Sequence, residues 1–242
     1  METMHDKAII SPERDDSWMA GAIQATPVVL GYVPVGFAYG VLASKAGLSI
    51  LNTVLMSVLV YGGASQFIAV GLMAAGASAL TIILTTFAVN LRHLIMASAV
   101  APYLRGWRKL HLAAFSYELT DESFALHSVD FIKNPPQKRR VFALNSTCQL
   151  SWVFGSYLGA AAGNLIPDVK PYALDFALPA LFVALVVFQA QTRLKAIVAV
   201  ATGAAAIALY MAGMNQWYVI IAAVIGATLG TVLEQWIKQP SS

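Results

Sequence analysis

The sequence carries too little charge to cover the surface of a water-soluble protein. Only 11% of its 242 residues are Asp, Glu, Lys or Arg, whereas soluble domains average about 25%. No charged residue occurs in five long stretches, namely 18–44, 46–91, 141–167, 176–192 and 196–233. Because roughly 20 apolar residues form a helix long enough to cross a bilayer, these stretches predict an all-α polytopic membrane protein with seven or eight transmembrane helices.

The sequence also lacks the signatures of several functional classes. The one cysteine, Cys148, excludes an internal disulfide, and His93, His111 and His127 are too widely spaced for a metal motif. There is no P-loop, dinucleotide fingerprint or Gly-x-Ser-x-Gly elbow. We therefore expect no enzymatic activity, no metal and no cofactor. The net charge of +3 is too small to indicate a nucleic-acid partner, and basic loops at a membrane surface explain it.

Composition divides the chain into five regions. They are a polar N-terminal tail (1–17), a first transmembrane region with an acidic segment (18–131), a basic loop (132–140), a second transmembrane bundle (141–237) and a C-terminal tail (238–242). The tail 1–17 has no apolar core and is therefore not a secretory signal. The candidate spans are 18–44, 50–73, 78–104, 111–131, 141–163, 172–190, 194–213 and 216–237.

The segment 111–131 decides the topology. It holds six ionisable residues, too many for a helix that faces lipid: His111, Glu118, Asp121, Glu122, His127 and Asp130. If it crosses the membrane, the chain has eight spans and both termini lie inside. If it is re-entrant, there are seven spans and the N-terminus lies outside, which the distribution of Lys and Arg favours.

An internal comparison favours eight spans instead. It pairs Gly36–Tyr39 with Ser123–Leu126, Ser65–Phe67 with Cys148–Leu150, and Phe87–Arg92 with Phe188–Arg193. These matches suggest two three-span units related by inversion, followed by two further helices. Inverted repeats with broken helices are a frequent transporter plan, and we therefore favour the eight-span topology.

Two spans contain helix-breaking residues. The first has Pro27, Gly31, Pro34, Gly36 and Gly40, which predict either a broken helix whose free amides face a substrate or a kinked, closely packed helix. The second has Gly62 and Gly63 followed by Ser65 and Gln66. We favour an unwound segment that lines a site at the middle of the membrane over hydrogen bonds between helices. The recurring glycines Gly155, Gly159 and Gly163, and Gly226 and Gly230, are typical of close helix packing.

Polar residues also interrupt the third span, at Asn90, Arg92 and His93. An arginine inside a membrane needs a carboxylate or a substrate anion. The alternative is that this span ends near Val89 and that Arg92 lies at the interface.

The acidic cluster of 118–122 is the strongest chemical signal. On a continuous helix, Glu118 and Glu122 would share one face, where they could take up a proton or hold an ammonium group. The alternative is an acidic loop exposed to water. Apolar neighbours favour the first interpretation; they are Phe115, Leu119, Phe124 and Leu126.

Five ordered motifs resemble the AzlC/YgaZ family, the large subunits of branched-chain amino acid exporters. They are Pro34–Gly40, Gly63–Phe67, Asn90–Met96, Ala101–Leu104 and Leu119–Phe124. The resemblance covers about residues 18–200 and departs from the family pattern at Ala97, where glycine is expected. It implies export of valine and similar amino acids across a bacterial cytoplasmic membrane, together with a small hydrophobic subunit of the AzlD/YgaH type.

The candidate residues suit such a zwitterion. We expect amides near Pro34 or Gly62 and Gly63, and Arg92, to bind the carboxylate, and Asp121 or Glu122 to bind the ammonium group. We expect the branched side chain to contact Phe37, Phe67 or Phe124. The remaining candidates for substrate binding are Tyr39, Ser65, Gln66 and Asn90, and those for proton coupling are Glu118, Asp121, Glu122, His93 and His127. A channel or a non-transporting membrane scaffold is the alternative.

Overall fold

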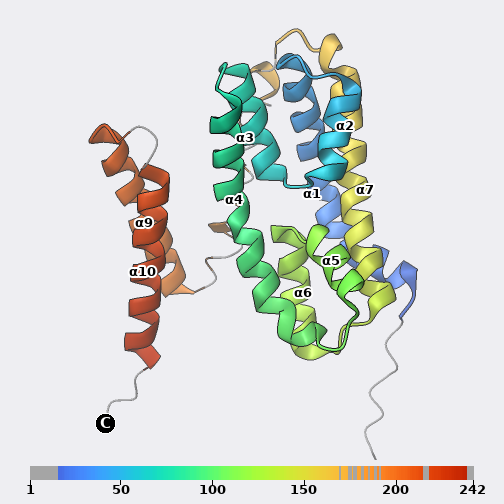
Figure 1. Ribbon diagram of the computed structural model, residues 1–242, viewed down its shortest axis with the longest axis vertical. Coiled ribbons are helices and arrows are strands. Elements are labelled where there is room, and N and C mark those ends of the chain that lie inside the picture. Colours follow the sequence, from blue (N-terminus) through green and yellow to red (C-terminus); the bar gives the residue numbers. More distant parts are fainter. Residues whose placement is uncertain are drawn as a thin grey trace, which may run out of the picture. The chain divides into compact units, whose positions relative to one another are not determined.

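The structure, a computed structural model, describes residues 16–168, 170–173, 176, 179–180, 183–184, 186–187, 190, 192–214 and 218–238. The predicted span 172–190 and the tails 1–17 and 238–242 lie largely outside these residues. Regular structure within them is helical: α1 (Trp18–Lys45), α2 (Ile50–Leu59), α3 (Gly63–Ala74), α4 (Ala79–Val100), α5 (Lys109–Tyr117), α6 (Asp121–Lys133), α7 (Lys138–Ala162), α9 (Arg193–Met211) and α10 (Tyr218–Lys238), with short 3-10 turns (Figure 1). Among the described residues, three helices are long and apolar enough to cross a bilayer: α1, α4 with its extension to Leu104, and α9.

The chain forms two compact units with a boundary between residues 178 and 179. The first unit contains α1 to α7, and the second contains α9 and α10. In the second unit Gly226 of α10 packs against Thr202 of α9. The all-α polytopic architecture expected from the sequence is confirmed, and the candidate site lies entirely in the first unit.

The helix ends follow from local sequence. Ser17, Ser49 and Ser78 cap α1, α2 and α4, because each serine side chain accepts a hydrogen bond from a backbone amide of the first turn. Gly47 and Gly76 have positive φ angles and turn the chain after α1 and after α3.

Helices α1 and α7 form the rigid centre of the first unit. They run in the same direction, since Gly21 near the start of α1 meets Arg140 and Ser44 near its end meets Gly163. Glycines bring the two backbones together: a Cβ atom on Gly159 would lie 2.0 Å from the Phe37 carbonyl oxygen. The expected close packing by glycines is confirmed here.

The first span is continuous, which decides between the two alternatives for it. Pro27 and Pro34 both lie inside α1, and Pro34 is exposed. The helix therefore offers no broken end to a substrate. Of the two alternatives for this span, the closely packed helix is the one present.

Helices α2 and α3 form a hairpin rather than a single span. Gln66 Nε2 donates a hydrogen bond of 3.1 Å to Ser57 Oγ, whereas nine residues of continuous helix would separate the two by about 13.5 Å. Phe67 then packs against Tyr39, in the second half of α1, with ring centroids 5.7 Å apart. The chain thus enters the unit from this end, breaks at residues 60–62 and returns. The expectation that 50–73 crosses as one helix is wrong.

Helices α5 and α6 form a second hairpin that enters from the opposite end (Figure 1). The rings of Phe115 and Phe131 lie 6.3 Å apart, although sixteen residues of continuous helix would separate them by about 24 Å. The segment 111–131 is therefore re-entrant, and the favoured eight-span crossing is wrong for it. The structure shows an inverted arrangement, but it pairs α2–α3 with α5–α6 and not the residues matched in the sequence.

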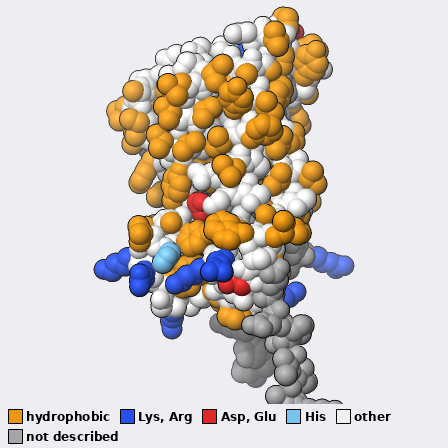
Figure 2. Space-filling view, turned by 90° about the vertical axis from the view of Figure 1, so that its right-hand side faces the viewer, with side chains coloured by type: hydrophobic (Ala, Val, Ile, Leu, Met, Phe, Trp, Pro, Cys, Tyr) orange, Lys and Arg blue, Asp and Glu red, His pale blue; other side chains and the backbone are white. Residues whose placement is uncertain are grey.

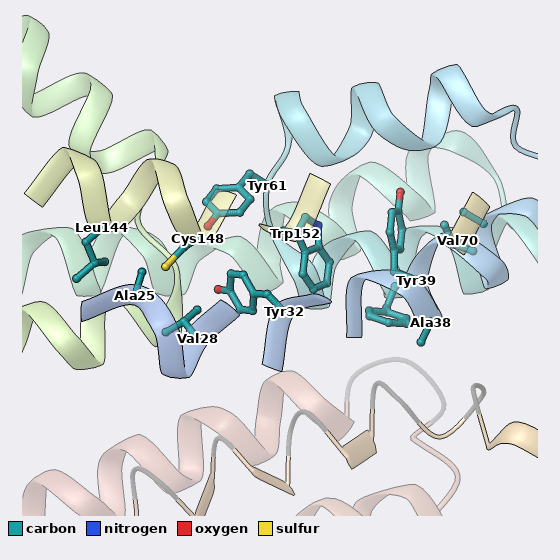
Figure 3. Close-up of a cluster of buried hydrophobic side chains, with 12 residues drawn as sticks. Ala25, Val28, Tyr32, Ala38, Tyr39, Tyr61, Val70, Leu144, Cys148 and Trp152 are labelled. Atoms are coloured by element: carbon teal, nitrogen blue, oxygen red, sulfur yellow. The ribbon is translucent and has the colours of Figure 1, made fainter. Parts of the chain in front are cut away.

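Two buried clusters fill the unit. One is rich in aromatic side chains from α1, α3 and α7 and centres on Trp152 (Figure 3). The other lies toward the start of α7 and holds Met96, Phe115, Phe131 and Val141. Tyr61, in the break of α2–α3, belongs to the first cluster, and Leu119, in the break of α5–α6, belongs to the second.

Basic side chains gather at the end of the unit where α1 and α7 begin, below a belt of hydrophobic side chains (Figure 2). They are Arg105, Arg108, Lys109, Lys133, Lys138, Arg139 and Arg140. At the other end, residues 16–168 contribute only Lys45. By the positive-inside rule, we expect the basic end to face the cytoplasm. The start of α1 is then cytoplasmic, and α5–α6 enters from the cytoplasmic side. This differs from the outside N-terminus of the seven-span alternative, because 50–73 does not cross the membrane either.

Candidate functional site

The tips of the two hairpins meet in the middle of the first unit. The hydroxyl of Tyr117, at the end of α5, donates a hydrogen bond to the carbonyl of Val58 near the end of α2. Gln149 of α7 donates to the same carbonyl at 3.2 Å and to the Tyr117 hydroxyl at 3.0 Å. A helix that breaks leaves carbonyls without helical partners, and here side chains from α5 and α7 satisfy one of them.

The start of α6 is fixed by a capping box. Thr120 Oγ1 accepts from the Ser123 amide at 3.3 Å, and Ser123 Oγ accepts from the Thr120 amide at 2.9 Å. This cap explains why the helix begins at Asp121 in the middle of the unit. It places Asp121 and Glu122 in the first helical turn, where the helix dipole stabilises carboxylates.

Glu122 is held by a tyrosine from α1. The Tyr32 hydroxyl lies 2.6 Å from Glu122 Oε2 and 2.7 Å from Thr120 Oγ1. Tyr32 itself is buried and contacts the Trp152 ring edge to face at 5.4 Å. The carboxylate of Glu122 is thus oriented by the rigid α1–α7 pair.

Asp121 is paired with Arg92 of α4. The distance from Arg92 Nη1 to Asp121 Oδ2 is 2.9 Å, and the two side chains are 26% and 13% exposed. Helix α4 continues to Val100, so the alternative in which the span ends near Val89 is wrong. The sequence-based requirement for a carboxylate partner of Arg92 is met by Asp121.

Asn90 lies two residues before Arg92 on α4 and faces the tip of α2–α3. Its Oδ1 atom would lie 3.3 Å from a Cβ atom on Gly62. That oxygen and Arg92 Nε are buried and have no hydrogen-bond partner among the described residues. No side chain caps the start of α3 at Gly62, whereas the Gly62 carbonyl accepts from Ser65 and from the Gln66 amide.

Glu118 lies outside α6, which corrects the expectation that it shares a helical face with Glu122. It is the residue that follows α5, and its Oε1 atom accepts a hydrogen bond of 3.0 Å from Ser146 of α7. The two carboxylates are thus held by different helices. Both side chains are partly buried, so the segment is not a loop in bulk water.

We call these groups the tip cluster. It comprises Tyr32, Gly62, Asn90, Arg92, Glu118, Thr120, Asp121 and Glu122. Its members come from α1, from α4 and from both hairpins. Among the described residues, no group of three or more His, Cys, Asp or Glu side chains comes together that could hold a metal ion.

Several predicted site residues lie in the packed core instead. Gln66 is buried, accepts from Trp152 Nε1 at 3.0 Å and donates to Ser57, so both polar atoms of its amide are hydrogen-bonded within the core. Ser65 donates to the Gly62 carbonyl at 2.7 Å. A Cβ atom on Gly63 would lie 3.1 Å from the Trp152 ring. These residues shape the α2–α3 tip, and Ser65 contacts the tip cluster through Gly62.

The predicted aromatic residues and histidines also have packing partners. Tyr39 and Phe67 contact each other and Trp152, and the Phe37 backbone packs on Gly159. Phe124 packs against the cluster around Met96 and Phe115. His93 Nδ1 bonds to the Asn90 carbonyl at 3.1 Å, and His127 bonds to Asn145 at 2.7 Å. Among the described residues, no hydrogen bond or ring contact joins these side chains to the carboxylates of the tip cluster.

Sequence reasoning missed Tyr32, Thr120 and Ser146. The polar residues of α7 could have indicated a contribution of this helix to the site, because Asn145, Ser146 and Gln149 lie close together in a stretch without charged residues. Tyr61 was also missed; it has a positive φ of 44° at the tip of α2–α3, an uncommon conformation for a residue other than glycine. The hydroxyls of Tyr32 and Tyr61 point toward the same side, near Cys148 (Figure 3).

The model of the AzlC protein family matches residues 27–166. The inner membrane protein YgaZ of Escherichia coli is 30% identical over 220 residues, covering 88% of each chain. An uncharacterized membrane protein of Archaeoglobus fulgidus is 37% identical over 211 residues, 86% of this chain and 92% of its own. The branched-chain amino acid transport protein AzlC of Bacillus subtilis is 25% identical over 195 residues, 80% of this chain and 76% of its own. No solved structure matches the chain.

Proposed function

This chain belongs to the AzlC protein family, and from that premise we propose that it exports branched-chain amino acids such as L-valine from the cytoplasm. The family match includes the whole tip cluster, and the Bacillus subtilis relative is named a branched-chain amino acid transport protein. The observation that carries the proposal is the placement of Arg92 and Glu122 where two opposed hairpins meet. Charged groups inside a membrane protein typically mark a substrate or ion path.

The tip cluster offers complementary partners to an amino acid headgroup. Glu122, oriented by Tyr32, binds the ammonium group, with Glu118 as the second carboxylate nearby. Arg92 Nε and the uncapped amides at the start of α3 bind the carboxylate. Asn90 Oδ1 supplies one more acceptor. Backbone breaks of this kind are tolerated at membrane depth where they line a cavity or are buried in protein.

The opposed hairpins support a carrier rather than a channel. One break is reached from the cytoplasmic end and the other from the opposite end, and in this structure the tips are in contact. A carrier can expose such a site to one side at a time. A channel needs polar groups along its whole length, whereas here they are concentrated at the tips.

The function is tested by L-valine counterflow in proteoliposomes that contain the purified chain. We expect saturable counterflow that requires, or is strongly increased by, a small hydrophobic subunit of the AzlD/YgaH type. Flux that rises linearly with concentration would identify a channel. No flux with or without that subunit would favour a scaffold.

Proton coupling is a second proposal, supported by the carboxylates Glu118 and Glu122 inside the bundle. It is tested in the same vesicles by imposing a pH gradient. A gradient that drives valine uphill supports coupling, and valine flux that ignores the gradient contradicts it.

A further inference from the structure

We infer that Asp121 is a built-in competitor of the substrate: its carboxylate occupies Arg92 until the carboxylate of an incoming amino acid displaces it. The inference rests on the proposed function, because it assumes an amino acid headgroup at the tip cluster. In this role Asp121 competes with the substrate's carboxylate and does not bind its ammonium group.

Within the described part of the chain, only some of the hydrogen-bond donors of the Arg92 guanidinium have partners. Nη1 contacts Asp121 Oδ2 at 2.9 Å, while Nε is buried without a hydrogen-bond partner among the described residues. The donors of arginine form a rigid fork that suits a carboxylate. An enclosed donor without a partner costs free energy, so this side of Arg92 favours the approach of a second acceptor.

Two carboxylates on one guanidinium repel each other inside a protein, where charges are weakly screened. A substrate carboxylate that binds Arg92 therefore weakens its contact with Asp121. Asp121 and the substrate compete because both present a carboxylate to Arg92. Glu122, which is held separately by Tyr32, remains in place for the substrate's ammonium group.

The competition has a structural consequence, because the ion pair joins α4 to the first residue of α6. The tip of the α5–α6 hairpin is also tied to α1 through Tyr32 and to α7 through Ser146. Tyr32 and Thr120 are buried, whereas Arg92 and Asp121 are partly exposed. The tie to α1 is therefore enclosed, whereas the tie to α4 is partly exposed and can be reached by a substrate. Its release by substrate would link occupation of the site to movement of the cytoplasmic hairpin.

The test compares L-valine affinity in the full-length wild type and in Asp121→Asn by calorimetry. If Asp121 competes, the variant binds valine at least about fivefold more tightly, the size of a typical coupling between sites. Saturating valine should also raise the melting temperature more in the variant than in the wild type, because only the substrate then neutralises Arg92. L-valinol, which lacks the carboxylate, should show neither effect.

Weaker or unchanged valine affinity in Asp121→Asn would overturn the inference and leave the proposed function standing, with Asp121 as a ligand or a bystander. Absence of valine binding to the wild type would instead overturn the proposed function itself. If Asp121→Asn protein cannot be recovered, Asp121→Ser removes the same charge and carries the same expectation.

Discussion

The Tyr32 hydroxyl donates a hydrogen bond of 2.6 Å to Glu122 Oε2, although 90 positions separate the two residues. Tyr32 belongs to α1, which glycines lock against α7. Glu122 belongs to the first turn of a re-entrant half-helix. The contact therefore fixes a carboxylate at a hairpin tip to the most rigid part of the unit.

Replacing Tyr32 by Phe tests this contact. The variant Tyr32→Phe should bind L-valine about tenfold more weakly, because a hydrogen bond to a charged group is lost and Glu122 is no longer oriented. Tyr39→Phe is the matched control, since Tyr39 lies two turns further along α1 and stacks on Trp152. Equal affinity in the two variants would remove Tyr32 from the site.

The glycine contact between α1 and α7 predicts a difference between two alanine substitutions in one helix. A Cβ atom on Gly40 would lie 2.2 Å from the Ser156 carbonyl oxygen, whereas one on Gly31 meets nothing within 4 Å. Gly40→Ala should therefore lower the free energy of unfolding by about 1–3 kcal/mol or more. Gly31→Ala should leave it unchanged or raise it by up to about 1 kcal/mol. Thermal unfolding in detergent measures both, and similar melting temperatures would contradict the packing.

The buried bond between Trp152 and Gln66 predicts a coupling energy. Trp152→Phe leaves Gln66 Oε1 without its donor, which should cost about 1–3 kcal/mol beyond the lost ring contacts. The same change in a Gln66→Leu background should cost less, because no acceptor is then stranded. A double-mutant cycle measures the difference, and strictly additive effects would show that the bond contributes nothing.

The orientation of the unit is tested by cysteine labelling in a Cys148→Ala background. Arg108→Cys and Lys138→Cys flank the α5–α6 hairpin and should both react only after the cytoplasmic side is opened. Asn52→Cys and Ala75→Cys should react from outside in intact cells. Labelling of positions 108 and 138 from opposite sides would mean that 111–131 crosses the membrane.

Much of this arrangement was predictable from local patterns. Long uncharged stretches predicted membrane helices, the adjacent Gly62 and Gly63 predicted a break, and Arg92 within an apolar run required a carboxylate. These signals depend on the cost of unpaired polar groups in hydrocarbon. That cost does not depend on which residue is the partner. The sequence therefore predicts that a polar group needs a partner, but it does not identify the partner.

The reversal of the chain within each hairpin could not be predicted from local patterns. Hydropathy depends on composition, and 50–73 has the length and apolar character of a crossing whether or not it reverses. Reversal depends on contacts such as Gln66 with Ser57, between residues that lie on one apolar segment. The interpretation of Glu118 and Glu122 failed for the same reason, because it assumed a continuous helix across the break at 118–120.

Proline left the first span undecided. Pro27 and Pro34 were compatible with a broken helix or with a closely packed one, and α1 is continuous. A proline removes one helical hydrogen bond, and extensive glycine packing against α7 holds the helix together around it. The strength of that packing depends on Gly155 and Gly159, which lie more than a hundred residues further along the chain.

The most direct test of the account is the affinity of Glu122→Gln for L-valine, measured by calorimetry on the purified protein. We predict a loss of at least about thirtyfold, the size expected when one partner of an enclosed charge pair is neutralised. Asp130→Asn, which removes a carboxylate two turns further along α6, should bind valine like the wild type. If Glu122→Gln binds valine as tightly as Asp130→Asn does, the tip cluster is not the amino acid site.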